Sequence, residues 1–118
     1  MQTYIIAEVG PNHNGSLKMA KEYIRLLSNI GVNAIKFQLG DPKKIYSKDS
    51  FLPKYHNQKN KKNIIKSAKE RQLSRNDHIK LYNLCKKNKI DYLCTAFDLP
   101  SLKFLDNKFK LPFFKIAS

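Results

Sequence analysis

The stretch "IIAEVGPNHNGS" (residues 5–16) decides how the rest of the chain can be arranged. Its apolar start is typical of a buried strand, and Ser16 at its end is a residue type that caps helices. Between them, Gly10 and Pro11 favour a turn, and "NHNG" brings amide and imidazole groups to the end of the strand. A strand that ends on an acid, Glu8, and leads directly into a helix is typical of parallel α/β sheets.

Three further apolar runs continue this pattern. They are rich in β-branched and aromatic residues and are bounded by turn formers, which predicts strands. With the first run, the predicted strands are "YIIAEV" (4–9), "NAIKFQL" (33–39), "DYLCTAF" (91–97) and "FFKIA" (113–117). Helical spacing lies between them, with predicted caps at Ser16, at Ser74 in the capping-box pattern "SRND", and at Asp98. The alternation predicts an α/β fold with a parallel sheet and right-handed crossovers.

Residues 40–63 are the exception to this alternation. The stretch is long, irregular and interrupted by Pro42 and Pro53. A loop of this length inside a compact domain is usually either functional or disordered. We expect a weak helix to follow, from about Asn63 to about Arg71.

Composition restricts the class of protein. A chain of 118 residues that is 42% hydrophobic can form one packed domain, and no apolar run approaches the ~20 residues that span a bilayer. The start lacks the pattern of a signal peptide, and Cys85 and Cys94 lie in apolar patterns, so we expect a cytoplasmic protein with reduced thiols and no membrane partner.

The net charge of +14 suggests binding to nucleic acid, but 20 of the 23 basic residues are Lys and no nucleic-acid-binding motif is present. We therefore expect solvated lysines and no nucleic-acid partner.

Polar side chains recur on one face of the predicted strands. Because side chains alternate along a strand, one common side should receive polar groups near the carboxyl ends of the strands, namely Glu8, Lys36, Gln38, Thr95 and Lys115. An acid and two lysines in one interior are costly unless they form a buried ion-pair network or meet a ligand. Both alternatives stay open for a single residue. Several such residues at equivalent strand ends favour a site for an anion, because parallel α/β folds and TIM barrels bind ligands there.

The same blocks resemble the sialic acid synthases, a family that includes N-acetylneuraminate, legionaminate and pseudaminate synthases and a spore-coat polysaccharide relative. "IIAEVGPNHNGSLKMAKEYI" is similar to the opening of that family, and "NAIKFQ", "LCTAFD" and "FFKIAS" look like its next three blocks in the same order. The resemblance implies a partial TIM barrel. Residues 1–118 would be its N-terminal half, since a complete barrel has eight strands and about 250 residues. Residues 40–63 would be a variable segment that covers the site.

The resemblance also implies an activity, the condensation of phosphoenolpyruvate with an N-acetylated hexose such as N-acetylmannosamine to a nonulosonic acid, with release of phosphate. The residues implied as catalytic are Glu8, Lys36 and Lys115. Those implied to contact substrate are Gln38, Thr95, Phe97 (a wall of the sugar site), Ser118, His13 and Asn12. For His13 a hydrogen bond that orders the loop is the alternative. A metal role for His13 is weak, because no partner ligand is spaced around it.

The full-length enzyme would be a homodimer that uses a divalent metal, Mn²⁺ or Mg²⁺, whose ligands are not in this chain. The fragment alone is expected to be inactive, and it would be marginally stable, self-associate or need a complementing polypeptide, because half a barrel has open strand edges. Three other functions stay open. They are a phosphoenolpyruvate-condensing barrel that acts on a phosphorylated aldose, a non-catalytic remnant that binds a partner or small anions, and a basic nucleic-acid module. The motif "NHNG" directly after Glu8 favours the sialic acid synthases over the first of these.

Overall fold

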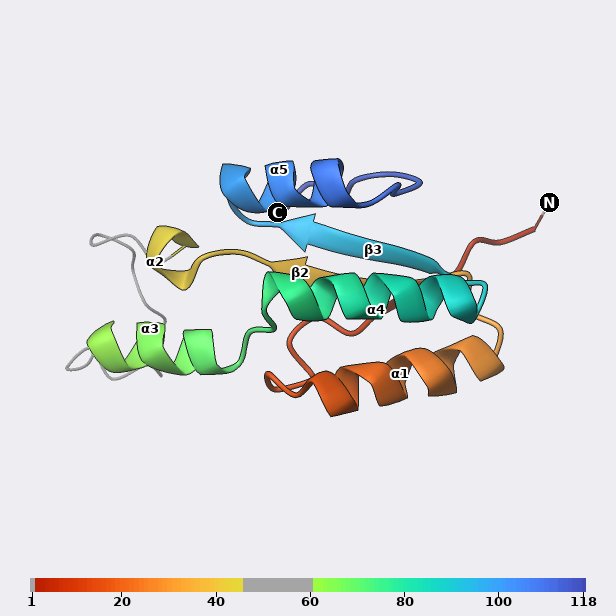
Figure 1. Cartoon of the computed structure of the whole chain (residues 1–118), viewed down its shortest axis with the longest axis horizontal. Helices are drawn as coiled ribbons and strands as arrows, with labels where there is room; N and C mark the ends of the chain where they lie inside the picture. Colours follow the sequence, from red (N-terminus) through yellow and green to blue (C-terminus); the bar gives the residue numbers. More distant parts are fainter. Residues whose placement is uncertain (1, 46–60) are drawn as a thin grey trace.

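The computed structural model describes residues 2–45 and 61–118, and it shows a parallel sheet covered by helices (Figure 1). The elements follow the chain in the order β1 (Ile6–Glu8), α1 (Leu17–Asn29), β2 (Ala34–Leu39), α2 (Pro42–Ile45), α3 (Lys61–Glu70), α4 (Arg75–Lys87), β3 (Asp91–Ala96) and α5 (Leu99–Lys108). The predicted α/β class is confirmed. No helix in the described ranges is long and apolar enough to cross a membrane.

The sheet has the order β1-β2-β3, and both strand pairs are parallel. Its register places Glu8 beside Lys36, and Gln38 beside Thr95. Since all strands run the same way, their carboxyl ends meet at one edge of the sheet. Of the polar residues that side-chain alternation grouped together, Glu8, Lys36, Gln38 and Thr95 lie on these three strands.

The three predicted helix caps are confirmed. The Ser16 hydroxyl accepts a hydrogen bond from the Met19 amide at 3.2 Å, and Asp98 accepts one from the Ser101 amide at 2.8 Å. Ser74 and Asp77 form both bonds of the capping box. Helices α1 and α4 lie side by side on one face of the sheet (Figure 1). The caps therefore fix where each helix begins after its strand or loop.

The predicted fourth strand, residues 113–117, is wrong in its extent. Within the described ranges the segment makes one parallel bridge, between Lys115 and Thr95, and forms no strand of the sheet. Phe114 and Ile116, the apolar residues that flank Lys115 in the predicted strand, are 40% and 80% exposed. A segment that buries neither side chain has little to stabilise a longer ladder, although its composition favours a strand.

The irregular stretch predicted for residues 40–63 is partly helical. Pro42 opens α2, where its missing N–H costs nothing, and the Asp41 carboxylate accepts a hydrogen bond from the Lys43 amide at 3.0 Å. The weak helix expected near Asn63 is confirmed as α3, which begins at Lys61. Residues 46–60 of the predicted loop lie outside the described residues.

Apolar side chains are exposed on β1, on the residues before it and on the C-terminal segment; they are Tyr4, Ile5, Ile6, Phe113, Phe114 and Ile116. The rings of Tyr4 and Phe113 lie 5.7 Å apart, so the two segments meet at these side chains, and exposed apolar surface that gathers in this way is typical of an interaction site. The structure contains one chain, so the expected self-association or complementation stays a prediction.

The core between the sheet and the helices contains a buried aromatic cluster. Phe37 is fully buried, and its ring stacks on Tyr92 with the centroids 5.7 Å apart. His78 is also fully buried, and its Nδ1 lies 2.5 Å from the Tyr92 hydroxyl, while its Nε2 has no hydrogen-bond partner in the described part of the chain. Burial, with a smaller contribution from nearby His13, lowers the pKa of His78 to about 4, while Asp77 opposes the shift.

We expect this cluster to make the fold sensitive to acid. The pKa of His78 is lower in the folded chain (about 4) than the ordinary value of 6.5, so its contribution is present above pH 6.5 and is lost as the pH falls toward 4. A shift of this size corresponds to roughly 2 kcal/mol of unfolding free energy at pH 4.5. Urea unfolding at pH 7.0 and at pH 4.5 measures this loss of unfolding free energy. Because carboxylates also titrate, H78Q is the reference, and it should lose clearly less stability between these two pH values than the wild type. Equal losses would contradict the assignment to His78.

Candidate active site

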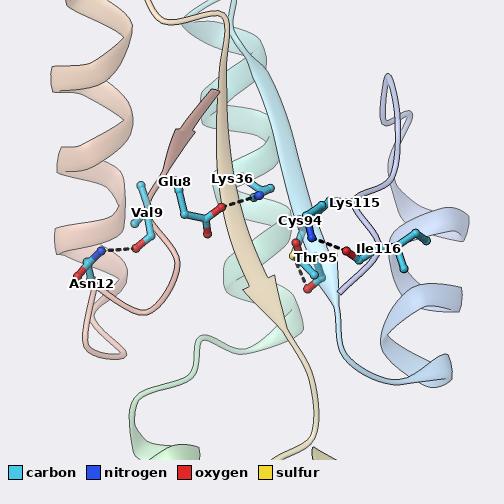
Figure 2. Close-up of polar contacts among 8 residues, drawn as sticks. All are labelled: Glu8, Val9, Asn12, Lys36, Cys94, Thr95, Lys115 and Ile116. Atoms are coloured by element: carbon cyan, nitrogen blue, oxygen red, sulfur yellow. Dashed lines mark hydrogen bonds and ion pairs between the residues drawn. The ribbon is translucent and has the colours of Figure 1, made fainter. Parts of the chain in front are cut away.

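Neighbouring positions on β1 and β2 bring an acidic and a basic side chain together, because Glu8, the last residue of β1, lies in register with Lys36 in the middle of β2. Glu8 Oε2 and Lys36 Nζ lie 2.7 Å apart, and Figure 2 shows the two side chains pointing toward each other across the strands. The Lys36 side chain is 18% exposed and that of Glu8 is 45% exposed. Ion pairs that water reaches contribute little to stability. The pair therefore contributes little to the stability of the fold.

Gln38 lies two residues after Lys36 on β2, so its side chain is on the same face of the sheet. Gly10, directly after β1, has a φ of +51°, and a Cβ built on it would lie 3.2 Å from Glu8 Oε1 and 3.3 Å from Gln38 Nε2. The turn at Gly10 therefore passes close over both side chains. A positive φ together with this close approach explains why the turn has glycine at this position.

β3 contributes Thr95, which lies beside Gln38 in the register and is 5% exposed. The bridge brings the backbone of Lys115 next to Thr95, but the Lys115 ammonium donates to the carbonyl oxygen of Ile116 (Figure 2). The backbone of Lys115 is thus at the predicted place, while its ammonium group is bound within its own segment. Ser118 is exposed at the end of that segment.

Phe97 follows β3 at the same edge and is 41% exposed. Its amide donates to the Leu39 carbonyl at 2.9 Å, so the chain still pairs with the last residue of β2 one residue beyond the end of β3. The structure thus brings Glu8, Lys36 and Gln38 together and places Thr95 and Phe97 along the neighbouring strand end. Their predicted roles toward substrate stay predictions.

Asn12 and His13 make contacts within their own loop. The side-chain amide of Asn12 donates to the Val9 carbonyl at 2.8 Å (Figure 2). His13 is 3% exposed, its Nδ1 accepts from the Gly15 amide at 3.0 Å, and its ring centroid lies 6.3 Å from that of Phe37 in the core. Burial lowers the pKa of His13, which favours the neutral ring that this bond needs. The loop-ordering bond considered for His13 is therefore present, and the substrate contacts predicted for both residues stay untested.

No three His, Cys, Asp or Glu side chains in the described ranges are grouped so that they could hold a metal ion. The residues of this edge therefore do not form a donor set for the divalent metal that the resemblance implies. We assign no step of the chemistry in this chain to a metal.

Asp98 does more than the sequence predicted. Besides capping α5 through the Ser101 amide, its Oδ2 accepts a hydrogen bond from the Asp41 amide at 2.6 Å, across 57 positions of sequence. Partial burial opposes ionisation, but the bonds from the Asp41 and Ser101 amides, together with nearby Lys44, outweigh it and lower the pKa of Asp98. An aspartate before a helix shows only its capping role in sequence, so no local signal revealed the second bond.

A cavity of about 240 Å³ lies beside Asp98, lined by Leu39, Gly40, Asp41, Lys44, Leu73, Arg75, Asp98, Pro100 and Ser101. None of the predicted site residues is among these. It is therefore a feature separate from the row of Glu8, Lys36 and Gln38.

Comparisons with known proteins show which family the chain belongs to. The model of the NeuB family matches residues 23–118. The N,N'-diacetyllegionaminic acid synthase of Legionella pneumophila is 34% identical over 107 residues, which are 89% of this chain and 30% of that protein. The N-acetylneuraminate-9-phosphate synthase of Drosophila melanogaster is 31% identical over 98% of this chain and 31% of its own length.

A solved structure has a similar fold. The crystal structure of N-acetylneuraminic acid synthetase from Leptospira borgpetersenii in complex with citrate superposes with a TM-score of 0.81 at 26% identity, covering 98% of this chain and 36% of that one. The chain thus spans about a third of the length of these relatives.

Proposed function

The chain belongs to the NeuB family, and we propose that it forms the N-terminal part of a synthase that joins phosphoenolpyruvate to an N-acetylated sugar to make a nonulosonic acid. The named relatives, which include a legionaminic acid synthase and an N-acetylneuraminate-9-phosphate synthase, support a product of this class. The main support for the proposal is the Glu8–Lys36 ion pair between β1 and β2. Gln38 follows on the same face of β2, and Thr95 lies beside Gln38 on β3.

In this proposal each residue has a role that its chemistry allows. Lys36 supplies a point charge to the phosphate or carboxylate of phosphoenolpyruvate, and the Thr95 hydroxyl donates a hydrogen bond to the same anion. Glu8 orients a hydroxyl group or transfers a proton, and Gln38 offers an amide to the sugar. Cations placed in advance beside developing negative charge lower the barrier to reaction without reorganising during it.

The rest of the site would come from outside residues 1–118. The remaining barrel strands, the ligands of the Mn²⁺ or Mg²⁺ ion, and the homodimer are proposals for the whole synthase, and so is a cytoplasmic location. A half site binds less tightly than a complete one, because fewer groups surround the anion. The proposal for this chain is therefore recognition of phosphoenolpyruvate without turnover.

Isothermal titration calorimetry of the 118-residue chain with phosphoenolpyruvate tests the proposal. We expect a dissociation constant of roughly 0.1–1 mM, which corresponds to about 4–5.5 kcal/mol of binding free energy. Sulfate serves as the control anion and should bind at least about tenfold more weakly. A chain that binds phosphoenolpyruvate no better than sulfate would overturn the proposal and support a non-catalytic remnant.

A further inference from the structure

The chain segments that follow β2 and β3 are held together beyond the ends of the strands. Gly40 approaches Phe97 so closely that a Cβ on Gly40 would lie 2.9 Å from the Phe97 Cβ and 2.9 Å from Ile45 Cδ1. The Phe97 amide donates to the Leu39 carbonyl at 2.9 Å, directly before this contact. One residue further, the Asp98 carboxylate accepts from the Asp41 amide. Three successive contacts thus join the two segments.

The bond to Asp41 is more than a helix cap requires. An N-cap uses one side-chain oxygen, and Asp98 Oδ1 serves the Ser101 amide in this way. Its second oxygen accepts from the other segment at 2.6 Å, a short distance typical of a hydrogen bond to a charged group. A carboxylate can accept both bonds, whereas a serine hydroxyl, which is also a good cap, has a single oxygen.

We propose that Asp98 is a positioning residue that fixes Asp41 and the start of α2 against Phe97. Phe97 is 41% exposed, so burial holds its ring only in part, and Gly40 comes close to its Cβ where the two segments meet. The carboxylate therefore sets the direction in which the chain leaves β2 relative to Phe97. The inference rests on the proposed function in one respect, namely that Phe97 forms a wall of the sugar site.

The substitution D98S separates the two roles of Asp98. The serine hydroxyl can still cap the Ser101 amide, but it has no second oxygen for the Asp41 amide. We expect amide hydrogen exchange, followed by NMR, to remain within about threefold of wild type at Ser101 and to become at least about tenfold faster at Asp41. The nuclear Overhauser effect between the Gly40 Hα and Phe97 Hβ protons should weaken or disappear. D106S, at an exposed aspartate on the same helix, is the matched control and should change neither signal.

Two results would overturn the proposal. If the Asp41 amide stays protected and the Gly40–Phe97 signal persists in D98S, the carboxylate does not position the segment. If both amides lose protection together, Asp98 acts only through the stability of α5. Should D98S fail to fold, D98N, also a good cap with one acceptor oxygen, provides the same comparison. These signals are read without ligand, so failure of phosphoenolpyruvate binding would count against the proposed function and leave the positioning role standing.

Discussion

The substitution K36M is expected to weaken phosphoenolpyruvate binding by roughly 10- to 150-fold. This range corresponds to the loss of a hydrogen bond to a charged group, which costs about 1.5–3 kcal/mol. Lys36 is only 18% exposed and already lies 2.7 Å from Glu8, so its charge is held in one place beside the end of β1. Methionine keeps much of the length of the side chain and removes the charge, and calorimetry of both proteins gives the ratio of dissociation constants.

The control for K36M is a lysine that lies away from the strand edge. Lys80 on α4 is half exposed and 3.8 Å from Asp77, and K80M removes the same unit from the net charge of +14. Distant surface charges are screened at physiological salt, so K80M should change the dissociation constant by less than about twofold. If K36M and K80M weaken binding equally, the chain attracts the anion through its overall charge, and the strand edge is not a specific site.

The substitution F37A is expected to cost about 3–5 kcal/mol of unfolding free energy, as other truncations of buried aromatic residues do. Phe37 is fully buried on β2 and contacts rings from three other elements of the chain, those of His13, His78 and Tyr92. Small domains have a total stability of about 5–15 kcal/mol, so this loss should unfold a large fraction of a marginal chain. Urea unfolding followed by circular dichroism measures it.

The matched control for F37A is L26A on α1, because Leu26 is 66% exposed. Its truncation leaves no internal cavity and should cost less than about 1 kcal/mol. A cost for F37A as small as that of L26A would contradict the packing of β2 against the helices. It would also remove the support for Lys36 and Gln38, which lie on the opposite face of the same strand.

Local patterns predicted the parts of the fold that local physics determines. Strand alternation correctly placed Lys36 opposite buried Phe37, and the residues before each helix revealed the caps at Ser16 and Ser74. The approach of Glu8 to Lys36 could also be anticipated, since side-chain alternation placed both on the same face of neighbouring parallel strands. These features depend on residues close in sequence or on the common direction of the strands.

Features that depend on distant parts of the chain were missed. Residues 113–117 have the composition of a strand, but whether they pair depends on what covers Phe114 and Ile116, and both are exposed. The bond from Asp41 to Asp98 joins residues 57 positions apart, and the capping role of Asp98 already accounted for its presence. Likewise, the composition of "NHNG" could not show that His13 would turn into the core beside Phe37.

The central claim is that the carboxyl edge of β1, β2 and β3 recognises phosphoenolpyruvate. An NMR titration of the isotope-labelled chain with phosphoenolpyruvate, following every assigned amide, tests it most directly. We expect saturable shifts that are largest at Glu8, Lys36, Gln38 and Thr95. Shifts that follow the exposed lysines of the helices and leave the strand edge unchanged would contradict it.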